Sequence, residues 1–310
     1  MSALRYLVAA GSALITFSAL ADEPRVVADT PIAHSMVAMI MGPDAAPELL
    51  LERGADPHNF QLHPSQARAL ARADLVIWTS PLLSPWMARP IDSLVNAVVL
   101  DLAQVDGVRL QDFAPNSLLP GTQNEAQHDD DHGHEHADYD PHLWLDPQNA
   151  APMLRAIAAQ LSVLDPDNTT FYVENSQTAI SAMDGVRDDV AQTLAPVADA
   201  GLILHHDAYG YFATAFGLNV LGTITEGDAA DPGAARLHML RAAMADAGAV
   251  CLFPEVNHPS NLARVVAEGS PIRIGAALDP EGVAVDPGPE LYSQVLRNLA
   301  RAIADCVLTR

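Results

Sequence analysis

Residues 165–194 read DPDNTTFYVENSQTAISAMDGVRDDVAQTL, and this stretch decides how the chain is organised. It opens as a helix, since Asp165 is a favoured N-cap residue and Pro166 suits the first helical position. No further proline follows, and apolar side chains recur along the stretch at Phe171, Ile180, Met183, Val186, Val190 and Leu194. At about 1.5 Å per residue, a helix of about 28 residues would be roughly 42 Å long. We therefore expect one stiff helix, 165–196, that joins two lobes and limits how far they swing apart.

Short apolar runs alternate with helix-like segments on both sides of this helix. The strand-like runs are 25–28, 49–51, 75–78 and 98–100 before it, and 202–205, 220–224, 250–253 and 272–274 after it. The helix-like segments are 65–72, 84–96, 232–246, 259–268 and 289–307. Such alternation is typical of parallel sheets with helical crossovers. The sequence thus predicts an α/β fold of two lobes, 22–164 and 197–310, each a mainly parallel sheet flanked by helices.

The N-terminal residues have the three parts of a secretory signal. Arg5 precedes an apolar run from Tyr6 to about Phe17, and small residues lead to Ala21. The run is shorter than the roughly 20 apolar residues of a membrane span, which counts against the alternative of an uncleaved anchor. We expect cleavage after about Ala21 and a periplasmic protein that does not insert into the membrane.

Charge and cysteine content narrow the partners further. The formal net charge is -23, and all 16 basic residues are arginine. This excess of negative charge argues against nucleic acid and anionic lipid as partners and favours cations. The alternative explanation is that the negative charge keeps an exported protein soluble, and both can hold. Cys251 and Cys306 are the two cysteines, and in an oxidising compartment we expect a disulfide that stabilises the fold by about 4 kcal/mol. Two buried thiols are the alternative, and a thiolate metal site is disfavoured because no CxxC spacing exists.

The densest group of candidate metal ligands is HDDDHGHEHADYDPHLWLD, residues 128–146. Imidazole suits zinc, copper and nickel, and no basic residue lies between Arg109 and Arg155 to oppose a cation. Residues 128–138 of the His/Asp-rich loop 121–140 are low-complexity, so binding there must order a flexible segment. We expect weak metal capture by its histidines, which are His128, His132, His134 and His136. The fixed ligand is expected to be His142, which sits between two Asp-Pro pairs in an apolar surrounding.

Three further candidates follow predicted strands. His58 follows the run 49–51 in an Asp-Pro-His motif like that of His142, His206 follows the run 202–205, and Asp279 follows the run 272–274. Ligands of α/β sheets bind beyond the carboxyl ends of the strands. For any one of these residues a capping, core or surface role is the commoner explanation. Their joint placement predicts a closed tetrahedral site of three imidazoles and one carboxylate between the lobes.

Four motifs resemble those of the zinc-binding receptor proteins of ABC importers, the cluster A-I family that contains ZnuA and AztC. They are DPH at 56–58, DPHLWLDP at 140–147, HDAYGYF at 206–212 and LDP at 278–280. The similarity covers nearly the whole chain after the signal, including the acidic histidine-rich insertion and the two cysteines. The resemblance implies two α/β lobes joined by one long helix, a zinc ion at their interface and delivery to a membrane permease.

The resemblance assigns the metal ligands to His58, His142, His206 and Asp279. Similar manganese receptors carry a glutamate in place of His206, in keeping with that ion's preference for oxygen, so the imidazole favours zinc. We expect one tight Zn²⁺ site in a monomeric receptor that is not an enzyme. Its expected partner is the ABC permease, with a periplasmic zinc chaperone as a second candidate partner.

A zinc hydrolase and a zinc buffer or chaperone are two other functions that a zinc site of this kind allows. An exported zinc hydrolase needs an open coordination position and a general base, and the chain has no HExxH motif. A periplasmic zinc buffer or chaperone would use the same site without a permease. We expect no ligand role for His34, His63, His238 or His258. His63 and His205 depart from the family pattern, which makes them candidates for a contact behind the ligands or a weak auxiliary site.

Overall fold

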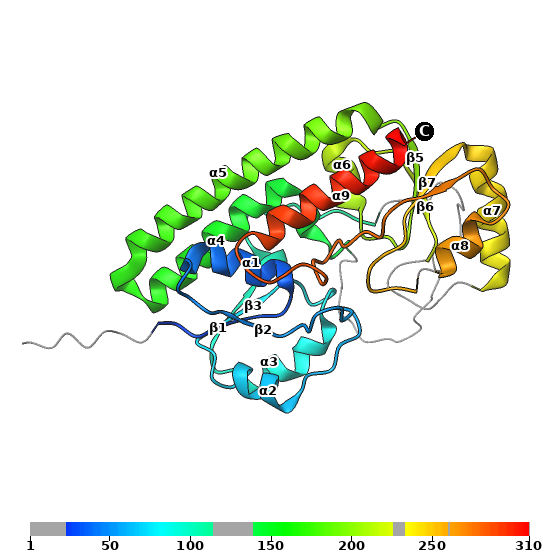
Figure 1. Cartoon of the computed structure of the whole chain (residues 1–310). Coiled ribbons are helices and arrows are strands. Elements are labelled where there is room, and N and C mark those ends of the chain that lie inside the picture. Colours follow the sequence, from blue (N-terminus) through cyan, green and yellow to red (C-terminus); the bar gives the residue numbers. More distant parts are fainter. Residues whose placement is uncertain (1–22, 114–138, 226–232, 260, 310) are drawn as a thin grey trace, which may run out of the picture.

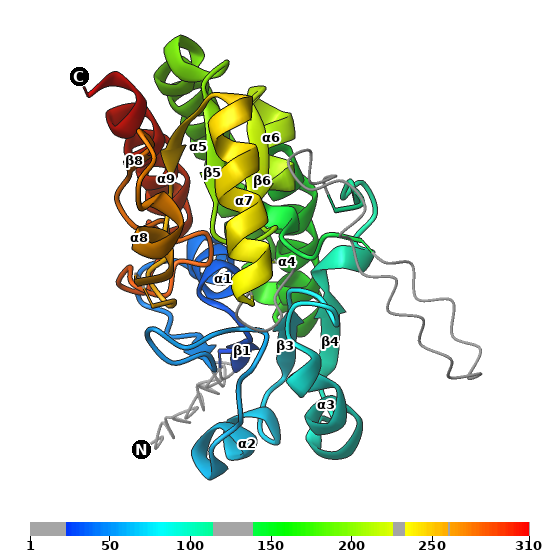
Figure 2. The same ribbon diagram turned by 90° about the vertical axis from the view of Figure 1, so that its right-hand side faces the viewer.

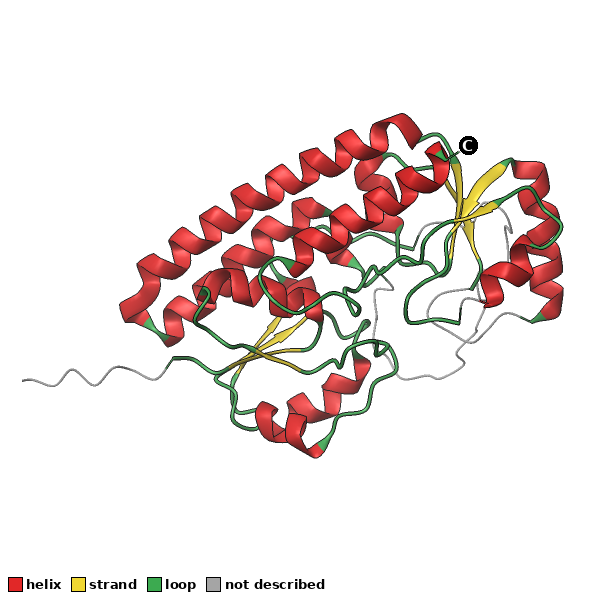
Figure 3. Ribbon diagram, viewed as in Figure 1, coloured by secondary structure: helices red, strands yellow, loops and turns green. Residues whose placement is uncertain are grey.

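The computed structural model describes residues 23–113, 139–225, 233–259 and 261–309. These residues form two four-stranded sheets in which every strand pair is parallel. The sheets lie apart and helices flank each of them (Figure 3). The predicted α/β fold with two mainly parallel sheets is therefore confirmed. The predicted signal segment and the loop histidines at 128–136 lie outside the described residues.

The main elements of the first lobe are β1 (Val26–Ala28), α1 (Pro31–Met41), β2 (Glu48–Leu49), α2 (Pro64–Leu70), β3 (Leu75–Trp78), α3 (Ala88–Leu94), β4 (Val98–Asp101) and α4 (Ala150–Leu164). The strand order is β2-β1-β3-β4. Alternate strand residues point to opposite faces, so Val27 and Val76 pack with Leu70 of α2, whereas Val26 and Ile77 join the core that contains α1. Figure 1 shows α2 and α3 on one side of this sheet and α1 and α4 on the other.

The second lobe repeats this arrangement with β5 (Gly201–Leu204), α6 (Gly210–Phe216), β6 (Val220–Thr223), α7 (Ala234–Ala247), β7 (Ala249–Leu252), α8 (Asn261–Ala267), β8 (Arg273–Ile274) and α9 (Leu291–Leu308). The strand order is β6-β5-β7-β8. Ile203 and Leu252 pack with side chains of α7 and α8, and Leu202 and Leu204 face the larger core shared with α9. Figure 2 shows α7 over the outer face of this sheet.

The long connecting helix is α5 (Thr169–Leu194), 26 residues, and it starts later than the sequence predicts. Pro166–Asn168 forms a separate 3-10 turn before it. The hydroxyl of Tyr172 donates to a carboxylate oxygen of Asp165 at 2.8 Å, which holds that turn against the helix. Tyr172 is buried in consequence, whereas Phe171, which the sequence pattern places on the apolar face, is 44% exposed.

Two helices rather than one run between the sheets. α9 lies along α5, contacts α1 of the first lobe and also contacts β7 of the second (Figure 1). The Ser35 hydroxyl donates to the carbonyl of Pro289 at 3.2 Å and accepts the backbone N–H of Tyr292 at 3.1 Å, so the start of α9 is fixed to α1. One continuous apolar core extends through these helices. The connection between the lobes is therefore stiffer than a single helix would make it.

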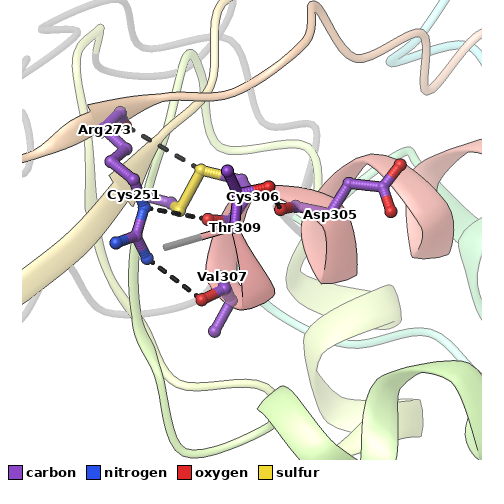
Figure 4. Close-up of a disulfide and its surroundings, with 6 residues drawn as sticks. All are labelled: Cys251, Arg273, Asp305, Cys306, Val307 and Thr309. Carbon is purple, nitrogen blue, oxygen red and sulfur yellow. Dashed lines mark hydrogen bonds between the residues drawn. A yellow bond between two sulfur atoms is a disulfide. The ribbon is translucent and has the colours of Figure 1, made fainter.

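The two cysteines are paired, as predicted. Cys251 of β7 and Cys306 of α9 form a disulfide across 55 positions of sequence. The guanidinium of Arg273 donates to the carbonyls of Cys306 and Val307 at 2.9 and 3.1 Å, where α9 ends (Figure 4). These contacts anchor the C-terminal helix to the second sheet. Among the described residues, no helix combines the length and the apolar character that crossing a bilayer requires.

Candidate metal centre

The two Asp-Pro-His motifs form the same turn at two places in the first lobe. Asp56 accepts the backbone N–H of His58 at 2.9 Å, and Asp140 accepts that of His142 at 3.0 Å. An aspartate that bonds the backbone two residues ahead is typical turn chemistry, and the proline between fixes one dihedral. The turns follow β2 and β4, so the first sheet presents both histidines beyond the carboxyl ends of its strands.

Two of the imidazoles are oriented by buried carboxylates. His142 Nδ1 lies 2.8 Å from Asp140 Oδ1, and His206 Nδ1 lies 2.8 Å from both carboxylate oxygens of Glu255. All four residues are buried. A carboxylate next to Nδ1 fixes the hydrogen on that nitrogen, so Nε2 carries the lone pair that a metal ion needs.

Four potential ligands from both lobes converge on one point. His58, His142, His206 and Glu281 each offer an atom that lies within 4.8 Å of the other three. The three imidazole centroids are 5.3 to 6.2 Å apart, and Glu281 Oε1 is 3.8 Å from His58 Nε2. Ligands of a tetrahedral zinc ion lie about 3.3 Å from one another. The donor set fits zinc in number and type after a modest contraction.

Among the described residues, this group contains Glu281 and not Asp279, which the family motif predicts as the fourth ligand. Both carboxylate oxygens of Asp279 accept backbone N–H groups, from Val283 at 3.0 Å and Ala284 at 2.8 Å. Glu281 instead accepts a hydrogen bond from the Asn257 side chain at 3.0 Å through Oε2. Asp279 thus holds the turn, and the turn presents Glu281. In the sequence, Glu281 is a second carboxylate that directly follows the LDP motif, two residues beyond Asp279.

Burial sets the protonation of the centre. Burial, together with the neighbouring His142 and His206 rings, lowers the pKa of His58 to about 2, so this imidazole is neutral. Burial raises the pKa of Glu281 well above its usual range, although His206 opposes the shift. Burial also acts to raise the pKa of Glu255, but the adjacent His206 ring outweighs it and lowers the pKa. A dication bound here would favour the ionised form of Glu281.

The ligand loops of the two lobes are bonded directly to each other. The indole N–H of Trp144, two residues after His142, donates to the carbonyl of Pro280 at 2.8 Å. The backbone N–H of Gly54 donates to the carbonyl of Val283 at 3.0 Å. These bonds connect each histidine loop of the first lobe to the loop that carries Glu281.

A family model described as "Zinc-uptake complex component A periplasmic" matches residues 26–306. The chain belongs to the ZnuA family. Its ZnuA relatives include a high-affinity zinc uptake system protein of Paracoccus denitrificans, 41% identical over 97% of both chains, and one of Brucella abortus, 33% identical over 94% of both. Because these alignments cover 94% or more of the chain, the family assignment applies to both lobes.

Solved structures of other proteins share the fold of this chain. A ZnuA crystal structure has a TM-score of 0.77 and 22% identity over 92% of this chain and 100% of that one. The periplasmic zinc-binding protein TroA from Treponema pallidum has a TM-score of 0.75 and 22% identity over 92% and 99%. At this identity the likeness concerns the fold.

The remaining described histidines divide by position. His34 lies 3.1 Å from the carbonyl of Pro47, His63 lies 3.2 Å from Glu52 at the surface, and His238 is exposed on α7. His205 and His258 are different. Their rings stack with centroids 4.3 Å apart, and the ring centroids of His258 and His206 are 6.1 Å apart.

Proposed function

We propose that this chain is a periplasmic receptor that captures one Zn²⁺ ion between its lobes and delivers it to the permease of an ABC importer. The observation that carries the proposal is the convergence of three imidazoles and one carboxylate from both lobes. Two of those imidazoles are oriented by buried carboxylates, which is typical of metal-binding histidine. The relatives named as high-affinity zinc uptake proteins support the choice of ion.

We propose His58, His142 and His206 as three ligands and Glu281 as the fourth. Both carboxylate oxygens of Asp279 accept backbone N–H groups of its own turn, whereas Glu281 Oε1 lies 3.8 Å from His58 Nε2. A nitrogen-rich set with one carboxylate suits zinc better than manganese, which prefers oxygen. Four protein donors fill a tetrahedron, so this site offers no open position of the kind that a hydrolytic zinc centre needs.

Release of the ion involves the ligand loops more than a wide opening of the lobes. α5 and α9 both run between the sheets and share one core, so hinge motion would break apolar packing. The loops meet through a few hydrogen bonds, such as that from Trp144 to Pro280, which cost less to exchange. Docking on the permease would separate the loops and free the ion.

We propose further that the exported chain is a processed monomer of two lobes. The signal is cleaved after about Ala21, and the lobes are 22–164 and 197–310, with α9 reaching back across the first. The chain acts as a monomer, because one chain supplies all four ligands. A zinc chaperone, where one is present, would load the same site. The loop histidines would capture zinc weakly.

Metal analysis of the exported protein with competitive zinc titration tests the proposal. We expect one tight zinc per chain, lost in His142→Ala and kept in the control His238→Ala, which changes an exposed histidine of α7. Wild-type affinity in His142→Ala would overturn the ligand assignment. A strain that lacks the gene should fail to grow when zinc is scarce, and His142→Ala should not restore it. Full growth without the gene would overturn the import function.

A further inference from the structure

A second group of potential ligands adjoins the first and shares one residue with it. His206, Glu255 and His258 each offer an atom within 4.8 Å of the other two. Glu255 lies three residues after the end of β7, and His258 lies three residues further on, with its Nε2 3.8 Å from Glu255 Oε2. The two groups therefore meet at the His206 ring.

This second group extends from the surface to the interior. The His258 side chain is 34% exposed, whereas the side chain of Glu255 is fully buried and that of His206 is 3% exposed. The ring of His258 stacks on the buried His205 ring at an interplanar angle of 31°. That stack holds His258 at the surface with its Nε2 toward Glu255. A cation arriving from solvent would meet His258 before it could meet His206.

We propose that Glu255 and His258 form an entry station for Zn²⁺, from which the ion passes along the His206 ring to the four-ligand centre. The inference rests on the proposed function and adds a route to it. Imidazole and carboxylate are suitable zinc ligands. His206 Nδ1 is 2.8 Å from both oxygens of Glu255, so one oxygen can bind the ion while the other keeps the hydrogen bond.

The transfer needs only ligand exchange. The hydrated ion exchanges two waters for His258 Nε2 and one oxygen of Glu255, and then exchanges these ligands for His206 Nε2 and the other inner ligands. No electron moves, and the remaining waters leave as the inner ligands bind. An ion in the centre repels a second dication a few ångströms away. The station therefore empties as the centre fills, and the chain keeps one tight zinc.

An entry station on the route changes the rates of zinc association and dissociation and leaves the binding equilibrium unchanged. His258→Ala should slow zinc association and chelator-driven dissociation by the same factor, about tenfold, with the Kd unaltered. His258→Phe, which keeps an aromatic ring on His205 but has no ligand nitrogen, should be equally slow. His258→Asp, which restores a metal ligand, should recover much of the rate. His238→Ala serves as the control for loss of an exposed histidine.

Stopped-flow mixing of the full exported chain with zinc and a fluorescent chelator gives both rates, and titration gives the Kd. Wild-type rates in His258→Ala would overturn the station, as would wild-type rates in His258→Phe, which would make the ring a packing element. A weakened Kd with unchanged association would make His258 a ligand of the tight site and would also overturn it. Failure of the wild-type chain to bind zinc tightly would overturn the proposed function itself, a result distinct from these.

Discussion

His206 Nδ1 lies 2.8 Å from both carboxylate oxygens of Glu255, and both residues are buried. His142 Nδ1 lies 2.8 Å from one carboxylate oxygen of Asp140. Asp56 of the other motif accepts the backbone N–H of His58, whose Nε2 lies 3.8 Å from Glu281. Carboxylates thus hold the rings of His142 and His206 in orientation before an ion arrives.

Zinc affinity should depend on the carboxylate behind His206. Glu255→Gln keeps the size of the side chain but removes the charge that orients the ring, so zinc affinity should fall about 10- to 100-fold. Competitive titration measures the change, and Glu52→Gln, which alters an exposed glutamate beside His63, is the matched control. Unchanged affinity in Glu255→Gln would show that the charge of this residue does not support the ligand.

The fourth ligand can be decided by two substitutions. Glu281→Gln should weaken zinc binding and leave the unfolding temperature nearly unchanged, because only the ion contact loses its charge. Asp279→Asn should mainly lower the free energy of unfolding, by about 1 kcal/mol, because the turn to Val283 and Ala284 loses one of its two oxygen acceptors. The reverse pattern, with tight binding lost only in Asp279→Asn, would restore the ligand that the family motif implies.

Stability should depend on pH through Asp101 at the end of β4. Burial, with a contribution from Asp29, raises the pKa of Asp101 from 3.8 to about 6. The unfolded chain then loses this proton first, so the free energy of unfolding falls as pH rises from about 4 to about 6. Asp101→Asn keeps an oxygen that accepts the N–H of Ala103 but cannot ionise. In this variant the decrease in the free energy of unfolding between about pH 4 and about pH 6 should be smaller by on the order of 1 kcal/mol, after allowance for solvent screening. Urea unfolding at several pH values measures it, and parallel curves for both proteins would contradict it.

The disulfide should contribute to stability and not to metal affinity. Its closed loop of 55 positions predicts a loss of about 4 kcal/mol when Cys251 and Cys306 are both changed to Ser. Zinc affinity should stay the same, because the bridge lies where α9 meets the second sheet and neither cysteine belongs to the ligand group. Unfolding with and without reductant, followed by titration, tests both parts. A large loss of affinity in the folded double variant would mean that the bridge positions the site.

The histidine-rich loop should be dispensable for tight binding. Deleting residues 125–136 removes four histidines and should reduce weak zinc binding while one tight zinc remains, since all four proposed ligands lie elsewhere. Equilibrium dialysis over a range of zinc concentrations separates the two classes of site. Disappearance of the tight class in the deletion variant would contradict this division.

Several features of the fold were predictable because they depend on local patterns. The strands β1, β3 and β5 follow apolar runs, and their alternate residues face two cores. The helices α1 and α4 were harder to identify. Ten of the eleven residues of α1 are buried, so the contrast between polar and apolar faces that indicates a helix is missing. The N-terminal boundary of α5 also escaped the pattern, because the Asp165 turn depends on its contact with Tyr172.

The sequence by itself determined the α/β alternation, the long helix, the paired Asp-Pro-His turns and the neighbourhood of the metal centre, because each depends on residues close together in the chain. The tertiary structure alone decided which carboxylate faces the imidazoles. Asp279 and Glu281 are two residues apart, and in the folded turn Asp279 accepts backbone N–H groups while Glu281 joins the three imidazoles. It also decided the place of His258, which no local pattern connects with His205 and His206. Their approach depends on the pairing of β5 with β7, a contact between strands far apart in sequence.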